Sequence, residues 1–154
     1  MTASVGDASE LRVGQVLPVG VVSFTAEGIK DFARLYDPQP FHLDEEAARA
    51  SIFGGLCASG FHTLSACFAA QVRAGVLTRC NLGGRGIAGV TWRRPTWPDV
   101  AYVLELEVRS LVPVPGKGRM EAAIGYVLRD PDGAVVMDAT LQHLLRWSGS
   151  GAAG

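Results

Sequence analysis

The second half of the chain alternates between apolar and polar positions with a period of two. In the first such run, the apolar positions are Tyr102, Leu104, Leu106 and Val108. The alternation recurs over residues 120–128 and 137–145, and turn signals at 113–118 and 130–133 separate the runs. Because a period of two is typical of strands with one buried face, the pattern predicts an antiparallel, hairpin-connected sheet from about Gly86 onward.

The first half of the chain has mostly helical spacing. A weakly alternating strand is predicted over residues 11–24, and Thr25 is a suitable N-cap for a helix that follows it. That helix must end at Asp37, because Pro38 follows and a residue before proline is pushed out of the α region. A short second helix is predicted over residues 44–50.

Residues 59–77 are predicted to form one long helix capped by Ser59. Its large apolar side chains fall on one face: Phe61, Leu64, Phe68, Val72 and Val76. Small residues fill much of the remaining surface, so neighbouring elements can approach closely and we expect the helix to be central and buried. A long buried helix followed by an antiparallel sheet predicts an α+β fold in which the sheet wraps around the helix.

Composition narrows the class of protein. The 154 residues are 48% hydrophobic and 19% charged, which fits one globular domain rather than a disordered chain. A net charge of −1 gives no general attraction to nucleic acid or to a membrane surface. We interpret residues 11–147 as the domain, 1–10 as a flexible N-terminus and 148–154 as a flexible tail. The three cysteines are interpreted as reduced thiols of a cytoplasmic protein.

The densest polar cluster of the first half lies at residues 37–44. Two prolines stiffen it, so the Asp37 carboxylate and the His42 imidazole are held in a defined relation. Such a pair can move a proton to or from water. From these residues alone a structural interpretation is equally open, with Asp37 in an Asx-turn and His42 as a buried, hydrogen-bonded side chain.

A second candidate is the pair Ser59-Gly60 at the start of the long helix. A helix N-terminus presents unpaired backbone N–H groups and the positive end of the helix dipole. Glycine lets a ligand approach the backbone closely, which suits an oxygen that gains negative charge during a reaction. An ordinary serine N-cap would explain the same two residues if they stood alone.

Together and in this order, these features resemble the MaoC-like dehydratase family, which includes the R-specific enoyl-CoA hydratases. The family motif D-x-N-P-x-H reads Asp37-Pro38-Gln39-Pro40-Phe41-His42 here, and the x-G pair that opens the central helix reads Ser59-Gly60. Residues 90–99 are similar to the family's R-P-x-x-P-G-D segment, and the resemblance covers residues 23–147.

The resemblance implies a hotdog domain that pairs into homodimers or assemblies of dimers, with an acyl-CoA thioester as substrate and no cofactor. In the family, the motif aspartate and histidine hold one catalytic water, which matches Asp37 and His42 here. The glycine at the helix start donates its N–H to the thioester oxygen, which matches Gly60, and Ser59 and Gln39 are assigned to the same substrate-binding region. The implied reaction is the reversible hydration of a 2-enoyl-CoA to an (R)-3-hydroxyacyl-CoA.

Three positions depart from the family pattern. Gln39 stands where the family has asparagine, Ser59 stands where R-specific hydratases often have histidine, and Phe68 stands where some of those enzymes have a serine in the site. The three histidines show no zinc-ligand spacing, so no metal site is predicted. Trp92 is expected in the core or in an interface, and the neighbouring arginines at 93 and 94 fit either a CoA phosphate or an exposed strand end.

Two other functions are weighed against hydration. A hotdog thioesterase would direct a carboxylate and water at the thioester carbonyl, but such enzymes typically lack the D-x-N-P-x-H pattern. A non-catalytic acyl-CoA-binding subunit has no need of a proton-transfer pair, so the presence of Asp37 and His42 argues against it.

Overall fold

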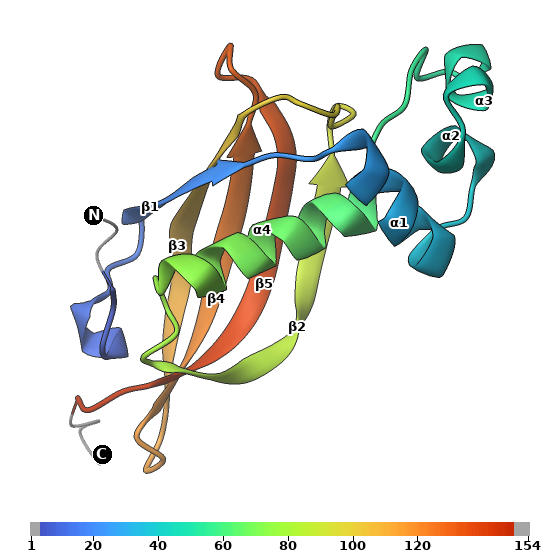
Figure 1. The fold of residues 1–154 in the computed structure, drawn as a ribbon. Helices are drawn as coiled ribbons and strands as arrows, with labels where there is room; N and C mark the ends of the chain where they lie inside the picture. The colour runs from blue at the N-terminus through green and yellow to red at the C-terminus, as the bar shows by residue number, and fades with distance from the viewer. Residues whose placement is uncertain (1–3, 150–154) are drawn as a thin grey trace.

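The structure, a computed structural model, describes residues 4–149. Its strands form one antiparallel sheet in the order β1-β3-β4-β5-β2. The strands are β1 (Val16–Val22), β2 (Asn81–Trp92), β3 (Tyr102–Val114), β4 (Arg119–Arg129) and β5 (Val135–Arg146). The long helix α4 (Gly60–Ala74) lies across one face of this sheet (Figure 1). This confirms the predicted α+β arrangement of an antiparallel sheet around one long helix.

The remaining α-helices gather beside the N-terminal end of α4 (Figure 1). They are α1 (Ala26–Tyr36), α2 (Pro40–Leu43) and α3 (Glu45–Ala50). Thr25 caps α1 as predicted, since its hydroxyl accepts a hydrogen bond from the Gly28 N–H at 2.9 Å. The helix α2 was not predicted, because four residues are too few to show a helical period.

The sheet follows the predicted alternation in β3, β4 and β5. In β3, Leu104, Leu106 and Val108 are fully buried, whereas Val103 is exposed. The strand β2 begins at Asn81, earlier than the predicted start near Gly86. It is exposed along most of its length, so its sequence shows no inside–outside pattern that would have marked the strand.

The apolar face predicted for residues 59–77 is buried only in part: Leu64 packs against the core and Val76 is fully buried. Phe61, Phe68 and Val72 are 60%, 38% and 41% exposed in the single chain. The buried residues of α4 are instead the smaller or polar Thr63, Cys67 and Gln71. The residues of α4 that face the interior of the domain are therefore not its most hydrophobic ones, and hydrophobicity alone does not identify them.

The segment 4–10, predicted to be part of a flexible N-terminus, packs against the domain. Val5 and Ala8 are buried, and the Val5 N–H donates to the Val76 carbonyl at 2.8 Å. The Asp7 carboxylate caps the short 3-10 helix Ala8–Glu10 and accepts a hydrogen bond from the Ser148 N–H at 3.0 Å. Most of the predicted tail, residues 150–154, lies outside the described residues.

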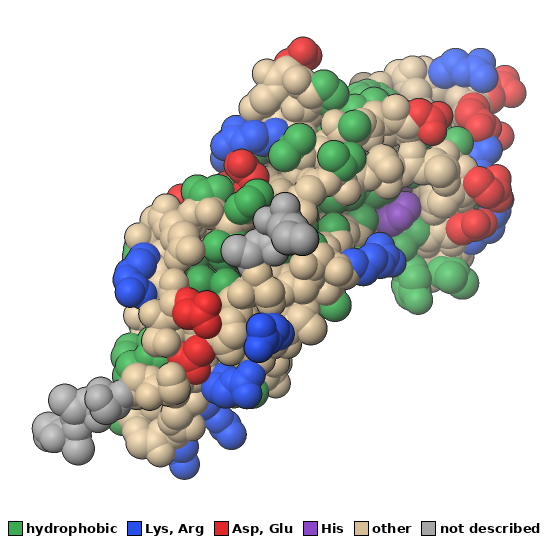
Figure 2. All heavy atoms as spheres, turned by 60° about the vertical axis from the view of Figure 1, so that its left-hand side comes forward, with side chains coloured by type: hydrophobic (Ala, Val, Ile, Leu, Met, Phe, Trp, Pro, Cys, Tyr) green, Lys and Arg blue, Asp and Glu red, His purple; other side chains and the backbone are tan. Residues whose placement is uncertain are grey.

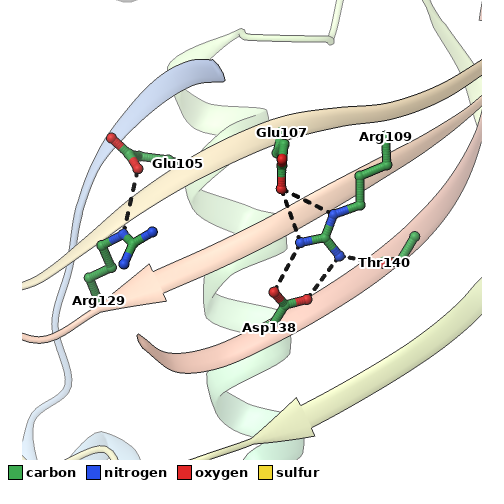
Figure 3. Close-up of polar contacts among 6 residues, drawn as sticks. All are labelled: Glu105, Glu107, Arg109, Arg129, Asp138 and Thr140. Carbon is green, nitrogen blue, oxygen red and sulfur yellow. Dashed lines mark hydrogen bonds and ion pairs between the residues drawn. The ribbon is translucent and has the colours of Figure 1, made fainter. Parts of the chain in front are cut away.

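The face of the sheet that points away from α4 carries an ionic network (Figure 3). The Arg109 guanidinium donates to both oxygens of Asp138, at 2.8 and 3.0 Å, and to the Thr140 hydroxyl at 2.6 Å. Glu107 lies 3.3 Å from the same guanidinium. To reach β5 from β3, the guanidinium crosses β4 over Gly125, where a Cβ atom would collide with it.

The charge distribution shows no dominant sign on the face drawn in Figure 2, where acidic and basic side chains are interspersed. This agrees with the net charge of −1. Among the helices within residues 4–149, none combines the length and the apolar character needed to cross a membrane.

Candidate active site

Asp37 and His42 come together at the junction of α1 and α2. Asp37 is the C-cap of α1, and its N–H still donates to the Ala33 carbonyl at 3.0 Å. Pro40 opens α2, which carries the His42 ring back toward the carboxylate. As a result, His42 Nε2 lies 3.4 Å from Asp37 Oδ2, and both side chains are largely buried.

The second ring nitrogen of His42 fixes the tautomer of the ring. His42 Nδ1 lies 2.7 Å from the backbone carbonyl oxygen of Cys57. Because a carbonyl oxygen only accepts hydrogen bonds, Nδ1 must carry a proton. In the neutral ring Nε2 is then a lone-pair acceptor, and it faces another acceptor, Asp37 Oδ2. A water molecule could satisfy both groups by donating one hydrogen to each.

Hydrogen-bond donors hold the Asp37 carboxylate in its ionised form. Gln39 Nε2 donates to Asp37 Oδ1 at 2.8 Å. Burial acts to raise the pKa of Asp37, but hydrogen bonds from Ser59 and Gln39 together with the charge of His42 outweigh it, so the pKa falls below its usual value of 3.8. The glutamine that departs from the family motif thus still reaches the motif aspartate.

Ser59 connects that carboxylate to the start of α4. Its side chain is a hydrogen-bond partner of Asp37, and its hydroxyl oxygen accepts the Phe61 N–H at 3.2 Å. Ser59 is 1% exposed and the Ser59 carbonyl accepts the Thr63 N–H at 2.9 Å. The predicted cap is therefore present, and the same hydroxyl also supports the candidate base.

The segment before α4 is tied to the loop that follows β2. The Ala58 N–H donates to the Thr96 carbonyl at 2.9 Å. The buried hydroxyls of Thr63 and Thr96 lie 2.8 Å apart. These contacts fix the path of residues 57–59, and with it the Cys57 carbonyl that orients His42. Nothing in the sequence marks the two threonines, since each acts through a contact between distant segments.

One cavity of about 430 Å³ brings the predicted residues together. Asp37, Gln39, His42 and Gly60 all line it, whereas the buried Ser59 supports it from behind. Its other walls are mostly aromatic or basic: Phe41, Phe53, Phe61, Trp92, Arg93 and Arg94. A cavity of this size, mostly apolar with a few converging polar groups, is typical of a small-molecule site.

Trp92 does not lie in the core, one of its two predicted places, and its predicted place in an interface stays a prediction. It is 43% exposed and lines the cavity. Its indole packs directly against Gly60, where a Cβ atom would lie only 2.5 Å from Trp92 Cε2. Position 60 therefore has room only for glycine beside the Trp92 indole. This holds without a ligand and adds to any need for a ligand to approach the backbone.

The other candidate groups are less suited to chemistry. The cysteines are free, and burial raises the pKa of Cys57 to about 11 and that of Cys67 to about 12, which makes either a poor nucleophile. The His62 ring stacks on Phe32 with ring centroids 4.6 Å apart and does not line the cavity. Among residues 4–149 no cluster of three or more histidine, cysteine or acidic side chains could hold a metal ion.

Comparison with known proteins gives a consistent result. The family model described as MaoC like domain matches residues 13–108. The uncharacterized protein YdeM of Bacillus subtilis (strain 168) is 31% identical over 104 residues, which are 68% of this chain and 74% of that protein.

Solved structures agree with the sequence comparison. The MaoC-like dehydratase from Rhodospirillum rubrum has a TM-score of 0.83 at 33% identity, covering 92% of this chain and 97% of that one. The unliganded R-hydratase PhaJ1 from Pseudomonas aeruginosa has a TM-score of 0.69 at 25% identity, covering 93% and 87%. These similarities confirm the hotdog domain that the sequence resemblance implied.

Proposed function

Since this chain belongs to the MaoC-like domain family, we propose that it is a lyase that reversibly hydrates a 2-enoyl-CoA thioester to an (R)-3-hydroxyacyl-CoA. The observation that carries the proposal is the placement of Asp37, His42 and Gly60 around one cavity. A carboxylate and an imidazole that can share a water, facing a helix N-terminus, are the groups that such a hydration needs.

In this proposal Asp37 and His42 hold the attacking water. A water that donates one hydrogen to Asp37 Oδ2 and the other to His42 Nε2 directs an oxygen lone pair away from both residues, toward the substrate. Its attack on C3 forms the new C–O bond and moves the C2–C3 π electrons toward the thioester. Asp37 takes one water proton as general base, and the second hydrogen stays on the new C3 hydroxyl. The Asp37–His42 pair then returns the proton that it took to C2, so the net result is the addition of one water.

Gly60 is proposed as the donor to the thioester oxygen. As C3 is attacked, negative charge develops on that oxygen, and the Gly60 N–H at the first position of α4 adds the positive end of the helix dipole. When C2 is protonated, the electron pair moves from the thioester oxygen back to carbon and forms the new C2–H bond. Ser59 and Gln39 hold the base in place through their hydrogen bonds to Asp37.

An absorbance assay tests this function. Short, medium and branched 2-enoyl-CoAs are offered, and loss of the enoyl-thioester absorbance is followed in parallel with release of free thiol. Loss of absorbance without thiol supports hydration, whereas thiol release would replace it with thioester hydrolysis. If neither occurs but acyl-CoAs raise the melting temperature, the chain is a binding subunit and the proposal fails.

We also propose that the chain forms a homodimer through β2 and α4. The strand β2 is an edge of the sheet, and an exposed edge invites pairing with another strand. Leu82 and Ile87 on β2 are 52% and 54% exposed, and Phe61 and Phe68 on α4 are also exposed. Sedimentation of Ile87→Lys against the wild type tests the pairing, and an unchanged dimer would exclude this edge.

A further inference from the structure

The contact between Trp92 and Gly60 places a bulky wall at the point where the proposed substrate would bind its oxygen. Three atoms of the indole lie 2.5–2.9 Å from the position that a Gly60 Cβ would take. Both residues line the same cavity as Asp37 and His42. A thioester whose oxygen accepts the Gly60 N–H must therefore share this part of the cavity with the indole.

The indole is held in place from two sides. Trp92 ends β2, where it pairs with Met137 of β5, and the next residue continues the attachment because the Arg93 N–H donates to the Val136 carbonyl at 2.8 Å. On the α4 side, the Trp92 ring packs edge-on against Phe61, with ring centroids 5.7 Å apart. The Trp92 indole is thus held in position by its neighbours and does not move freely at the surface.

We propose that Trp92 is the specificity-determining residue that restricts bulk beside the thioester, so that the site accepts enoyl groups with hydrogen at C2 and rejects those branched there. This inference rests on the hydration proposed above. In a 2-enoyl thioester, C2 lies between the carbonyl at Gly60 and the carbon attacked by the water at Asp37 and His42. A methyl group on C2 would compete with the indole for the same space.

The test measures kcat/KM for an unbranched 2-enoyl-CoA and for its 2-methyl counterpart. In Trp92→Leu, we expect the ratio of branched to unbranched kcat/KM to rise by about tenfold, since one methylene in a tight pocket changes discrimination by at least that factor. Trp97→Leu is the matched control, because Trp97 packs near Gly55 and is not among the residues that line this cavity. Trp92→Phe keeps a smaller ring and should give an intermediate ratio.

A second pair of variants tests the contact itself. Gly60→Ala should lose activity because its Cβ meets the indole, and Gly60→Ala combined with Trp92→Leu should recover at least part of it. Melting temperatures near that of the wild type show that each variant is folded; Trp92 is 43% exposed, so its loss leaves the core intact.

The outcomes separate the two proposals. A wild type that hydrates unbranched enoyl-CoAs, with Trp92→Leu leaving the branched-to-unbranched ratio unchanged, overturns the role of Trp92 alone. A ratio that rises equally in Trp97→Leu also overturns it, because the effect would then be general loosening. A wild type that hydrates none of the substrates removes the proposed function and this inference with it.

Discussion

Asp37 and Asp138 are two carboxylates whose surroundings both hold the pKa below its usual value, but they are paired in different ways. Both oxygens of Asp138 accept hydrogen bonds from the Arg109 guanidinium. This pairing is the main reason for the lowered pKa of Asp138. Asp37 has Gln39 on one oxygen, and its other oxygen faces a histidine nitrogen at 3.4 Å. One carboxylate is neutralised by a permanent cation, and the other keeps acceptor capacity directed at a cavity.

The difference shows why a lowered pKa does not identify a functional carboxylate. At Asp138 the low pKa reflects a structural ion pair on the outer face of the sheet. At Asp37 the donors Ser59 and Gln39, together with His42, keep the group ionised without a permanent cation bound to both of its oxygens, so it remains able to accept a proton. The two carboxylates differ in whether one oxygen is left without a cation. A substitution should therefore affect turnover at Asp37 and not at Asp138.

The largest expected effect is on turnover in Asp37→Asn. The amide cannot act as a base, so the hydration rate should fall by about 10²–10⁴-fold while the melting temperature stays close to that of the wild type. Asp138→Asn is the matched control and should leave the rate per folded molecule unchanged. Steady-state kinetics on both variants decide the point, and near-normal hydration by Asp37→Asn would rule out the proposed base.

A smaller effect is expected from Ser59→Ala, which removes one hydrogen-bond donor from Asp37. Because that donor lowers the pKa of Asp37, its loss raises the pKa, and the acid limb of the kcat/KM profile should move to higher pH. We expect turnover at neutral pH to fall by about tenfold, as for a base whose alignment is lost. Ser59→Thr keeps a hydroxyl and should retain the acid limb of the wild-type profile. If the acid limb is the same in wild type and Ser59→Ala, the positioning role of Ser59 is contradicted.

On the outer face, Gly125→Ala should affect stability and not activity. The new Cβ displaces the Arg109 guanidinium and breaks its bonds to Asp138, at a cost of about 1 kcal/mol in the free energy of unfolding. Gly84→Ala is the control, since nothing lies within 4 Å of its Cβ position. Denaturant unfolding measures both variants, and equal stability losses would mean that the network contributes nothing specific.

The smallest effect concerns acid stability and Asp7. Its hydrogen bond from the Ser9 N–H is the main cause that lowers the pKa from 3.8 to about 2. A carboxylate whose pKa is lower in the folded state than in the unfolded state stabilises the fold at pH values above the unfolded-state pKa. That stabilisation is lost as the pH falls toward the folded-state pKa. Melting curves of wild type and Asp7→Asn should therefore converge between about pH 4 and pH 2; a gap that does not change with pH would contradict this.

The sequence predicts features that depend on local chemistry. The strands β3 to β5 follow from alternation, the N-caps Thr25 and Ser59 follow from residue type, and the pairing of Asp37 with His42 follows from the prolines between them. All of these can be recognised within a few consecutive residues.

Features that depend on distant contacts could not be predicted. The face of α4 that packs inward carries Thr63 and Cys67 because partners elsewhere in the chain meet it there, while Phe61 remains exposed. The placement of Trp92 against Gly60 joins the end of a strand to the start of a helix, and no local pattern in the sequence records that contact.

The hydrogen bond between His42 and Cys57 has a consequence for how the chain can change. The acceptor at residue 57 is a backbone carbonyl, so replacing the cysteine side chain leaves the proton on Nδ1 of His42 where it is. An insertion or deletion between residues 51 and 59 would move the carbonyl itself and release the ring. Over generations this loop should therefore tolerate exchange of its side chains more readily than any change in its length.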